Sequence, residues 1–155
     1  MTCAQQRDIV DKHNSLRQEV ALGKVTGQSS AVDMTQMTWD KELAKVAQAW
    51  ADRCVYEHTP KRRLGIARFS YGQNLGLEVY SLKPASINDV LDFSTIVQMW
   101  FDEVKQYGYN NKYDSKTGHY SQVIWADSHL VGCGYSYYEV DKGYNIFYVC
   151  NYGPA

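Results

Sequence analysis

The chain has 155 residues, a formal net charge of −1 and only 21% charged residues. This length suits a single core, so we expect residues 1–155 to form one domain. The near-neutral charge excludes nucleic acid as a partner, because phosphate binding needs a strong basic field, and no apolar run reaches the roughly 18 residues that a transmembrane helix needs.

The N-terminal half of the sequence predicts two amphipathic helices. In the first, apolar residues recur at helical spacing over residues 9–20, and Leu22-Gly23 supplies the glycine that commonly follows a helix end. Asp40 is a good N-cap for the second helix, whose apolar stripe we expect to run over residues 43–54. Both helices therefore present one face to a core.

The C-terminal half is richer in strand signals. A turn at Gly72 opens an alternating segment that favours a strand, and residues 95–107 have the periodicity of a third helix. Segments 121–125, 135–140 and 144–149 also read as strands, and a short turn joins the last two into a hairpin. This order predicts an α+β fold in which helices cover a small antiparallel sheet.

Four cysteines make an even count without a C-x-x-C pair, which favours two disulfides in a secreted protein. If the last two strand candidates form a hairpin, Cys133 and Cys150 lie nearly opposite each other, which leaves Cys3 for Cys54. The alternative is four reduced cysteines in a cytosolic protein. Cys54 and His58 also have a spacing that suits a thiolate–imidazole pair, but a disulfide would remove the thiol.

Two histidines are candidates for chemistry. His119 lies in TGHYSQVIW, where we expect a loop to become a strand, and His58 follows the second helix. Imidazoles are common zinc ligands. Two further polar residues could reach the same place: Glu103 borders the buried stripe of the third predicted helix, and Gln73 begins the first predicted strand. We predict a cleft lined by these four residues. The alternative is that each histidine is structural, because no H-E-x-x-H motif links them.

Other reactive side chains carry weaker signals. His13 falls on the buried stripe of the first helix, which predicts a core histidine, and His129 falls in a predicted turn. Ser121 shares a side of its predicted strand with His119 but has no evident oxyanion hole. The basic run at residues 61–63 could attract anionic lipid heads or sulfated sugars, although short runs of this kind are usually solvated loops.

Several segments resemble one family, and together they span nearly the whole chain. HNSLR and MTWDKELAKVAQAWADRC resemble its first two helices, GQNL its first strand and WFDEVKQY its third helix. GHYSQVIW and YVCNYGPA resemble its two most specific motifs. The family is the CAP superfamily of cysteine-rich secretory proteins, antigen 5 and pathogenesis-related proteins. GQNL, KTGHYSQVIWA and VGCG are most similar to its antigen 5-like branch of invertebrate venom and saliva proteins.

The resemblance implies an α–β–α sandwich, secretion, and a central cleft with two histidines and two acidic residues. His58 and His119 match the histidines, and Glu103 matches one acid. Gln73 stands where most members have glutamate, and an amide is neither an anionic ligand nor a base. The resemblance therefore implies at most weak zinc binding, through the two histidines with Glu103 as a further candidate.

The function that the resemblance implies is binding. We expect a secreted, non-enzymatic protein that sequesters a small apolar ligand, such as a sterol or a fatty acid, or engages a host receptor and modulates immunity. The alternative is a protease-like hydrolase that uses His58, Glu103 and His119.

Overall fold

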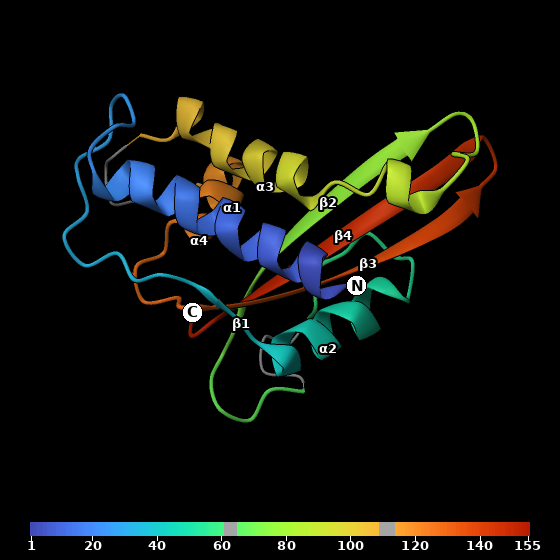
Figure 1. Ribbon diagram of the computed structural model, residues 1–155, viewed down its shortest axis with the longest axis horizontal. Coiled ribbons are helices and arrows are strands. Elements are labelled where there is room, and N and C mark those ends of the chain that lie inside the picture. Colours follow the sequence, from blue (N-terminus) through green and yellow to red (C-terminus); the bar gives the residue numbers. More distant parts are fainter. Residues whose placement is uncertain (61–64, 109–113) are drawn as a thin grey trace.

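Three layers build the fold, which a computed structural model describes for residues 1–60, 65–108 and 114–155. Helices α1 (Cys3–Ala21) and α3 (Phe93–Asp102) cover one face of a central sheet, and α2 (Lys41–Ala51) covers the other (Figure 1). The predicted α+β class and the α–β–α sandwich are therefore confirmed. The predicted basic run at residues 61–63 lies outside the described residues.

Local signals set both ends of α1. The Thr2 side chain accepts the N–H of Gln5, and the Gln5 side chain accepts the N–H of Thr2, which makes a capping box. The helix ends before Gly23, whose φ of 65° lies in the left-handed region that glycine adopts without strain. The buried residues of its inner face are Ile9, His13, Leu16, Arg17 and Val20.

Asp40 begins α2 as predicted, because its carboxylate accepts the N–H of Leu43 at 2.8 Å. The apolar stripe is shorter than the predicted one, which reaches residue 54. The helix ends at Ala51, and Cys54 lies beyond it with a positive φ of 55°. Cys54 is therefore not a member of the buried helical face.

The sheet has four strands in the order β1-β3-β4-β2. Strands β2 (Gly72–Tyr80), β3 (Leu130–Val140) and β4 (Gly143–Gly153) are antiparallel as predicted, and β3 and β4 form the predicted hairpin. Strand β1 (Thr38–Trp39) pairs with β3 in parallel, so the sheet is mixed and not wholly antiparallel. The sequence does not predict β1, because two residues are too few to show a period.

The prediction of a strand at residues 121–125 is wrong, because the chain forms helix α4 (Gly118–Val123) here. This short helix buries Tyr120 and Val123. His119 therefore lies in the first turn of a helix, and not at a junction between a loop and a strand.

The third predicted helix is confirmed in position. Its N-cap is Asp92, whose carboxylate accepts the N–H of Thr95 at 3.0 Å. The α-helical part, α3, ends at Asp102, and a 3₁₀ turn, Glu103–Gln106, continues it. Glu103 thus lies where the helix tightens, beside α4.

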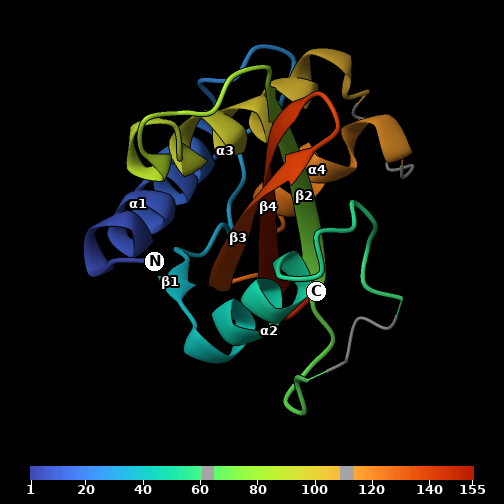
Figure 2. The same cartoon turned by 90° about the vertical axis from the view of Figure 1, so that its right-hand side faces the viewer.

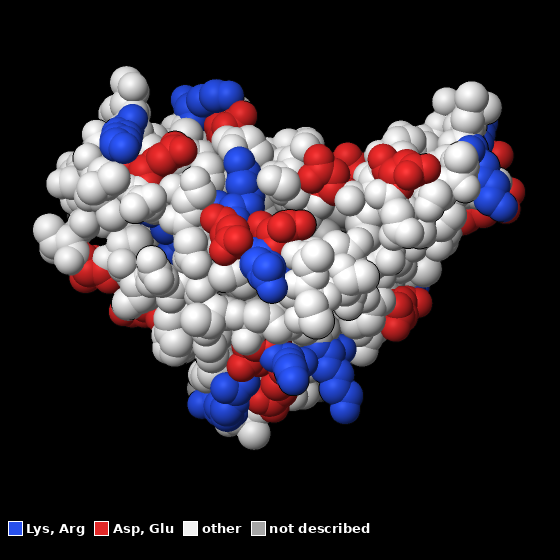
Figure 3. Space-filling view, viewed as in Figure 1, with Lys and Arg blue, Asp and Glu red and all other residues white. Residues whose placement is uncertain are grey.

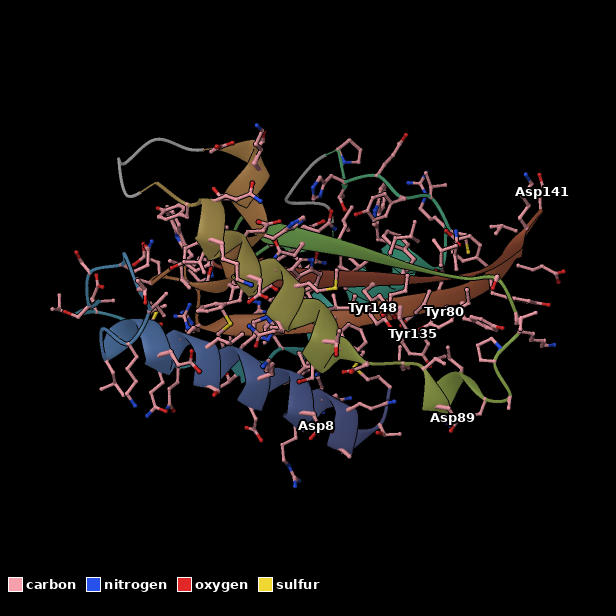
Figure 4. All side chains as sticks on the ribbon, turned by 90° about the horizontal axis from the view of Figure 1, so that it is seen from above. Asp8, Tyr80, Asp89, Tyr135, Asp141 and Tyr148 are labelled. Atoms are coloured by element: carbon pink, nitrogen blue, oxygen red, sulfur yellow. A yellow bond between two sulfur atoms is a disulfide. The ribbon has the colours of Figure 1, made fainter. Side chains whose placement is uncertain are left out.

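The two faces of the sheet pack differently. Under α1 and α3 lie Tyr135 and Tyr148 (Figure 4), and the ring of Phe93 contacts both edge to face. On the other face Gly134 lets α2 approach closely, because a Cβ on Gly134 would lie 2.4 Å from the Cα of Gln48. The glycine spacing in VGCG is therefore a packing requirement between strand and helix.

One predicted disulfide is present and the other is not. Cys133 and Cys150 are opposite each other in the β3–β4 ladder and are bonded. Cys3 and Cys54 are exposed and unbonded, so the prediction of a Cys3–Cys54 pair is wrong for this structure. The first pair follows from the register of a hairpin, whereas the second rests on elimination alone.

A buried arginine joins α1 to the loop that follows α4. The Arg17 guanidinium donates to the carbonyl oxygens of Thr35 at 2.6 Å, Val123 at 3.0 Å, Trp125 at 2.8 Å and Ser128 at 3.1 Å. Burial lowers the pKa of Arg17 to about 10, so the group remains charged at neutral pH. Its hydrogen bonds fix the C-terminal end of the helix that carries His119.

The remaining predictions concern two histidines and the membrane. His13 is completely buried, as predicted, and His129 is an exposed residue beside β3. Among the described residues, no helix is both long and apolar enough to cross a membrane.

Candidate functional site

An open cleft of about 620 Å³ lies between the first residues of β2 and helix α4. Figure 2 shows these two elements next to each other. Three of the four predicted residues, His58, Gln73 and His119, line this cleft, and Glu103 lies behind His119. Among the residues that the structure describes, the cleft is lined by His58, Tyr71, Gly72, Gln73, Asn74, Ser115, Gly118, His119, Ser121, Gln122, Trp125 and Ala155.

Glu103 positions His119 through both of its carboxylate oxygens. Oε1 lies 2.7 Å from Nδ1 of His119, and Oε2 accepts the backbone N–H groups of His119 and Tyr120 at 3.0 and 3.2 Å. A carboxylate that accepts the first N–H groups of a helix is a favourable capping interaction. Glu103 therefore caps α4 from another part of the chain and orients its imidazole at the same time.

Gln73 holds His58 in a comparable way. Its Nε2 donates to Thr59 Oγ1 at 2.9 Å and to Asn151 Oδ1 at 3.0 Å, so its Oε1 is the acceptor. This oxygen accepts the N–H of Thr59 and faces Nδ1 of His58, both at 3.0 Å. The buried amide is thus committed to four hydrogen bonds, which explains why glutamine suits this position.

These contacts determine the tautomers of both imidazoles. The partners of Nδ1 are acceptors in both cases, the Gln73 carbonyl for His58 and the Glu103 carboxylate for His119. Nδ1 must therefore carry the proton, and in the neutral ring the lone pair lies on Nε2. This arrangement is the one that metal-binding histidines usually adopt.

A stacked indole supports His119 from the core side. The rings of Trp100 and His119 are stacked with centroids 5.9 Å apart, and Trp100 Nε1 donates to the carbonyl of Leu75 at 3.1 Å. Trp100 is 4% exposed, so its position is fixed by the core. The orientation of His119 is therefore set both by Glu103 and by Trp100.

A buried hydrogen-bond chain runs from the cleft to α1. The amide of Asn74 donates to the carbonyl of His119 at 3.1 Å and to the Tyr152 hydroxyl at 3.4 Å. Tyr152 donates to Nε2 of His13 at 2.9 Å, because Nδ1 of His13 donates to the Ile9 carbonyl at 2.8 Å. Burial raises the pKa of Tyr152 and lowers that of His13 to about 4, so both groups are neutral at pH 7.

Ser121 lines the cleft but is not prepared as a nucleophile. Its hydroxyl donates to the carbonyl of Gly118 at 3.0 Å, one turn earlier in α4. The prediction that it shares a strand side with His119 is wrong, because both residues belong to the helix.

The donor set fits only weak metal coordination. Both carboxylate oxygens of Glu103 and the whole amide of Gln73 already have hydrogen-bond partners. Within the described residues, no group of three His, Cys, Asp or Glu side chains could hold a metal ion. The side chains in the cleft of a type that binds metals are therefore His58 and His119, with Glu103 acting behind His119.

Among the cleft residues absent from the sequence prediction are a tyrosine, Tyr71, and a tryptophan, Trp125. Tyr71 is 1% exposed and packs in a core cluster with Leu43 and Ile66, yet it is one of the residues that line the cleft. Trp125 is 50% exposed at the same cleft. The sequence indicates these two residues only by their nearness to predicted cleft residues, since Tyr71 comes shortly before Gln73 and Trp125 ends GHYSQVIW, which contains His119.

Comparisons with known proteins bear on the family and the fold of the chain. A sequence profile of CAP, the cysteine-rich secretory protein family, matches residues 10–152. Venom allergen 5 of Rhynchium brunneum is 39% identical over 165 residues, which cover 99% of this chain and 69% of that protein. The solved structure of BmVAL-1 has a TM-score of 0.80 and 27% identity, covering 100% of this chain and 79% of its own. The solved structure of NaASP2 with Zn²⁺ has a TM-score of 0.74 and 26% identity, and the match covers 100% of this chain and 82% of that chain.

Proposed function

Because the chain belongs to the cysteine-rich secretory protein (CAP) family, we propose that it is a secreted, non-enzymatic binding protein whose cleft holds a small ligand beside His119. The Cys133–Cys150 disulfide supports secretion, because such bonds persist in oxidising compartments. The similarity to a venom allergen supports it as well. The same family membership supports a single CAP domain over residues 1–155.

The Tyr71 hydroxyl is the observation that carries this proposal. It is buried, belongs to a residue that lines the cleft, and has no hydrogen-bond partner among the described residues. A buried polar group without a partner is costly, so a ligand atom that bonds to it gains affinity. Trp125 adds an aromatic surface to the same cleft. An apolar body with one hydroxyl or carboxyl head fits this combination, which is the chemistry of a sterol or a fatty acid.

The ligand test uses cholesterol and palmitate added to delipidated protein, with tryptophan fluorescence as the readout. Loss of one hydrogen bond should weaken binding roughly two- to tenfold in Tyr71→Phe. Tyr144→Phe, on the distant hairpin, is the matched control and should bind like the wild type. Absence of uptake of both lipids by the wild type, or equal binding by Tyr71→Phe, contradicts the proposal and favours engagement of a host receptor through another surface.

Zinc is a further candidate ligand of this cleft, held weakly by His58 and His119. A bound zinc ion would act there as a Lewis acid. Calorimetry with zinc chloride at pH 7 should give weak binding that is lost in His119→Ala. The solved relative named with Zn²⁺ supports testing this metal first.

Hydrolysis is the second candidate function, and the Glu103–His119 pair favours it, because a carboxylate commonly orients a general base. The hydroxyl of Ser121, which donates to a backbone carbonyl, supports binding instead. A protease-like enzyme would release product from a casein substrate and lose this activity in His119→Ala.

A further inference from the structure

The outer edge of β3 is a second surface with unpaired hydrogen-bonding groups. Strand β1 pairs only with Leu130 and Val131, at one end of β3. Over the described parts of the chain, no strand pairs with this edge beyond Val131. The edge lies between α2 and the N-terminal end of α1, on the side of the sheet where the N-terminus is seen in Figure 2.

Two contacts show which backbone groups of β3 point outward. The carbonyl of Val131 accepts the N–H of Asp40 at 2.8 Å, and Tyr135 bonds to a side chain of α2. In a strand, alternate residues direct their N–H and C=O to the same side. The outward residues beyond Val131 are therefore Cys133, Tyr135, Tyr137 and Glu139.

The side chain of Gln48 already imitates a strand partner at this edge. Its Nε2 donates to the Tyr135 carbonyl at 2.7 Å, and its Oε1 accepts the Tyr135 N–H at 3.2 Å. These are the two bonds that a residue of a neighbouring antiparallel strand would make. The second Nε2 hydrogen is held by Asp52 Oδ1 at 2.7 Å. The edge thus accepts an amide group in the geometry of sheet pairing.

Two hollows continue the edge on either side of Gln48. One, of about 320 Å³, lies toward Cys133 and the start of α2, and the other, of about 490 Å³, lies toward Tyr137 and the end of α2. Met1 and Gln48 line both, so together they form one groove. The Oγ of Ser136 and the hydroxyl of Tyr137, two residues that line the larger hollow, are buried without a partner in the described structure.

The charges along this groove differ between its ends. Lys41 and Lys45 line the hollow at the start of α2, are exposed, and make no ion pair with any described residue. Asp52 lines the other hollow, at the end of α2. Figure 3 shows basic side chains, with acidic ones among them, at the lower edge of the molecule, where α2 lies. An occupant with an acidic residue at one end and a basic residue at the other complements these charges.

We propose that this groove binds an extended peptide segment of a partner protein, which adds a strand to the edge of β3. The segment displaces the Gln48 amide from Tyr135 and pairs with the outward groups of Tyr135 and Tyr137. Its acidic end lies beside Lys41 and Lys45. Main-chain pairing supplies affinity in such complexes, and the flanking hollows supply selectivity for side chains.

The test begins with a displayed library of linear heptapeptides, selected on the full chain with its disulfide intact. Enriched peptides should be rich in β-forming residues and carry an acidic residue near one end. Anisotropy with a labelled synthetic copy then gives Kd. Lys45→Glu should weaken binding roughly tenfold, whereas Gln48→Ala should tighten it, because no internal amide must be displaced. Lys24→Glu, a charge reversal outside the groove, is the control and should bind like the wild type.

Backbone pairing has its own readout. N-methylation of the peptide at alternate residues should weaken binding roughly tenfold, while methylation at the residues between them should have little effect. Hydrogen exchange at the Tyr137 amide should slow when the peptide is bound. A library without enrichment, binding that tolerates every N-methyl group, or an unprotected Tyr137 amide overturns the proposal. Cholesterol or palmitate in excess should not compete, which keeps this result separate from that of the cleft.

Discussion

Stability against acid should depend on one buried imidazole, His13. Burial is the largest cause that lowers its pKa, from 6.5 to about 4, and the neighbouring Arg17 lowers it further. The unfolded chain therefore takes up a proton near pH 6.5 that the folded chain refuses until about pH 4. Because the unfolded state binds more protons in this window, the unfolding free energy falls as the pH falls. The loss is about 1.4 kcal/mol per pH unit, or about 3 kcal/mol across the window.

The assay is urea unfolding of the wild type and of His13→Gln at several pH values from 7 to 4.5. Glutamine does not titrate, so the variant should start less stable but lose much less stability with acid. The lowered pKa values of Asp40, Asp92 and Asp102 act below this range, where those carboxylates become protonated. Parallel pH dependences for the two proteins would refute the role assigned to His13.

Two further predictions concern the links that hold the core together. Arg17→Met should lower the unfolding free energy by about 3 kcal/mol or more, because several buried carbonyls lose their donor. Arg17→Lys should recover only part of this loss. Full recovery would show that the forked geometry of the guanidinium is unimportant. The Cys133→Ala and Cys150→Ala double variant should lose about 3 kcal/mol in urea unfolding, since the bond closes a loop with a sequence separation of 17; an unchanged midpoint would contradict this.

The elements with several turns or alternations could be predicted from the sequence. Residues 9–20 and 43–51 show enough helical repeats to define α1 and α2, and Asp40 marks the start of the latter. The β3–β4 hairpin follows from two strand-like segments and a short turn, and it also predicts the Cys133–Cys150 bond. The pairing of Cys3 with Cys54 has no comparable local basis.

Helix α4 could not be predicted, because its stabilising partner is distant in sequence. Six residues are too few to show a helical period, and Val123-Ile124-Trp125 has the composition of a strand. The first N–H groups of α4 are satisfied by Glu103, 16 residues before His119, and not by a local cap. Tertiary contact therefore overrides local propensity here.

For the cleft, the sequence predicts which residues take part but not which of them contact each other. His58, Gln73 and His119 are named from the sequence, and the fold brings all three to one cavity. Their pairing is not readable from spacing, because Gln73 and Glu103 reach their histidines across 15 and 16 residues. Glu103, a further candidate metal ligand by sequence, orients His119 and caps its helix in the structure. Only the folded contacts distinguish those two roles.

The position of β4 in the sheet has a consequence for how the chain acquires its structure during synthesis. β4 pairs with both β2 and β3, yet residues 143–153 follow every other strand in the sequence. While the ribosome is still adding earlier residues, β2 has no neighbour, and the helices have no sheet to cover. Long-range pairing of this kind forms slowly, and the unpaired strand edges favour aggregation meanwhile. Until β4 is made, the edges of β2 and β3 that it pairs with therefore stay open.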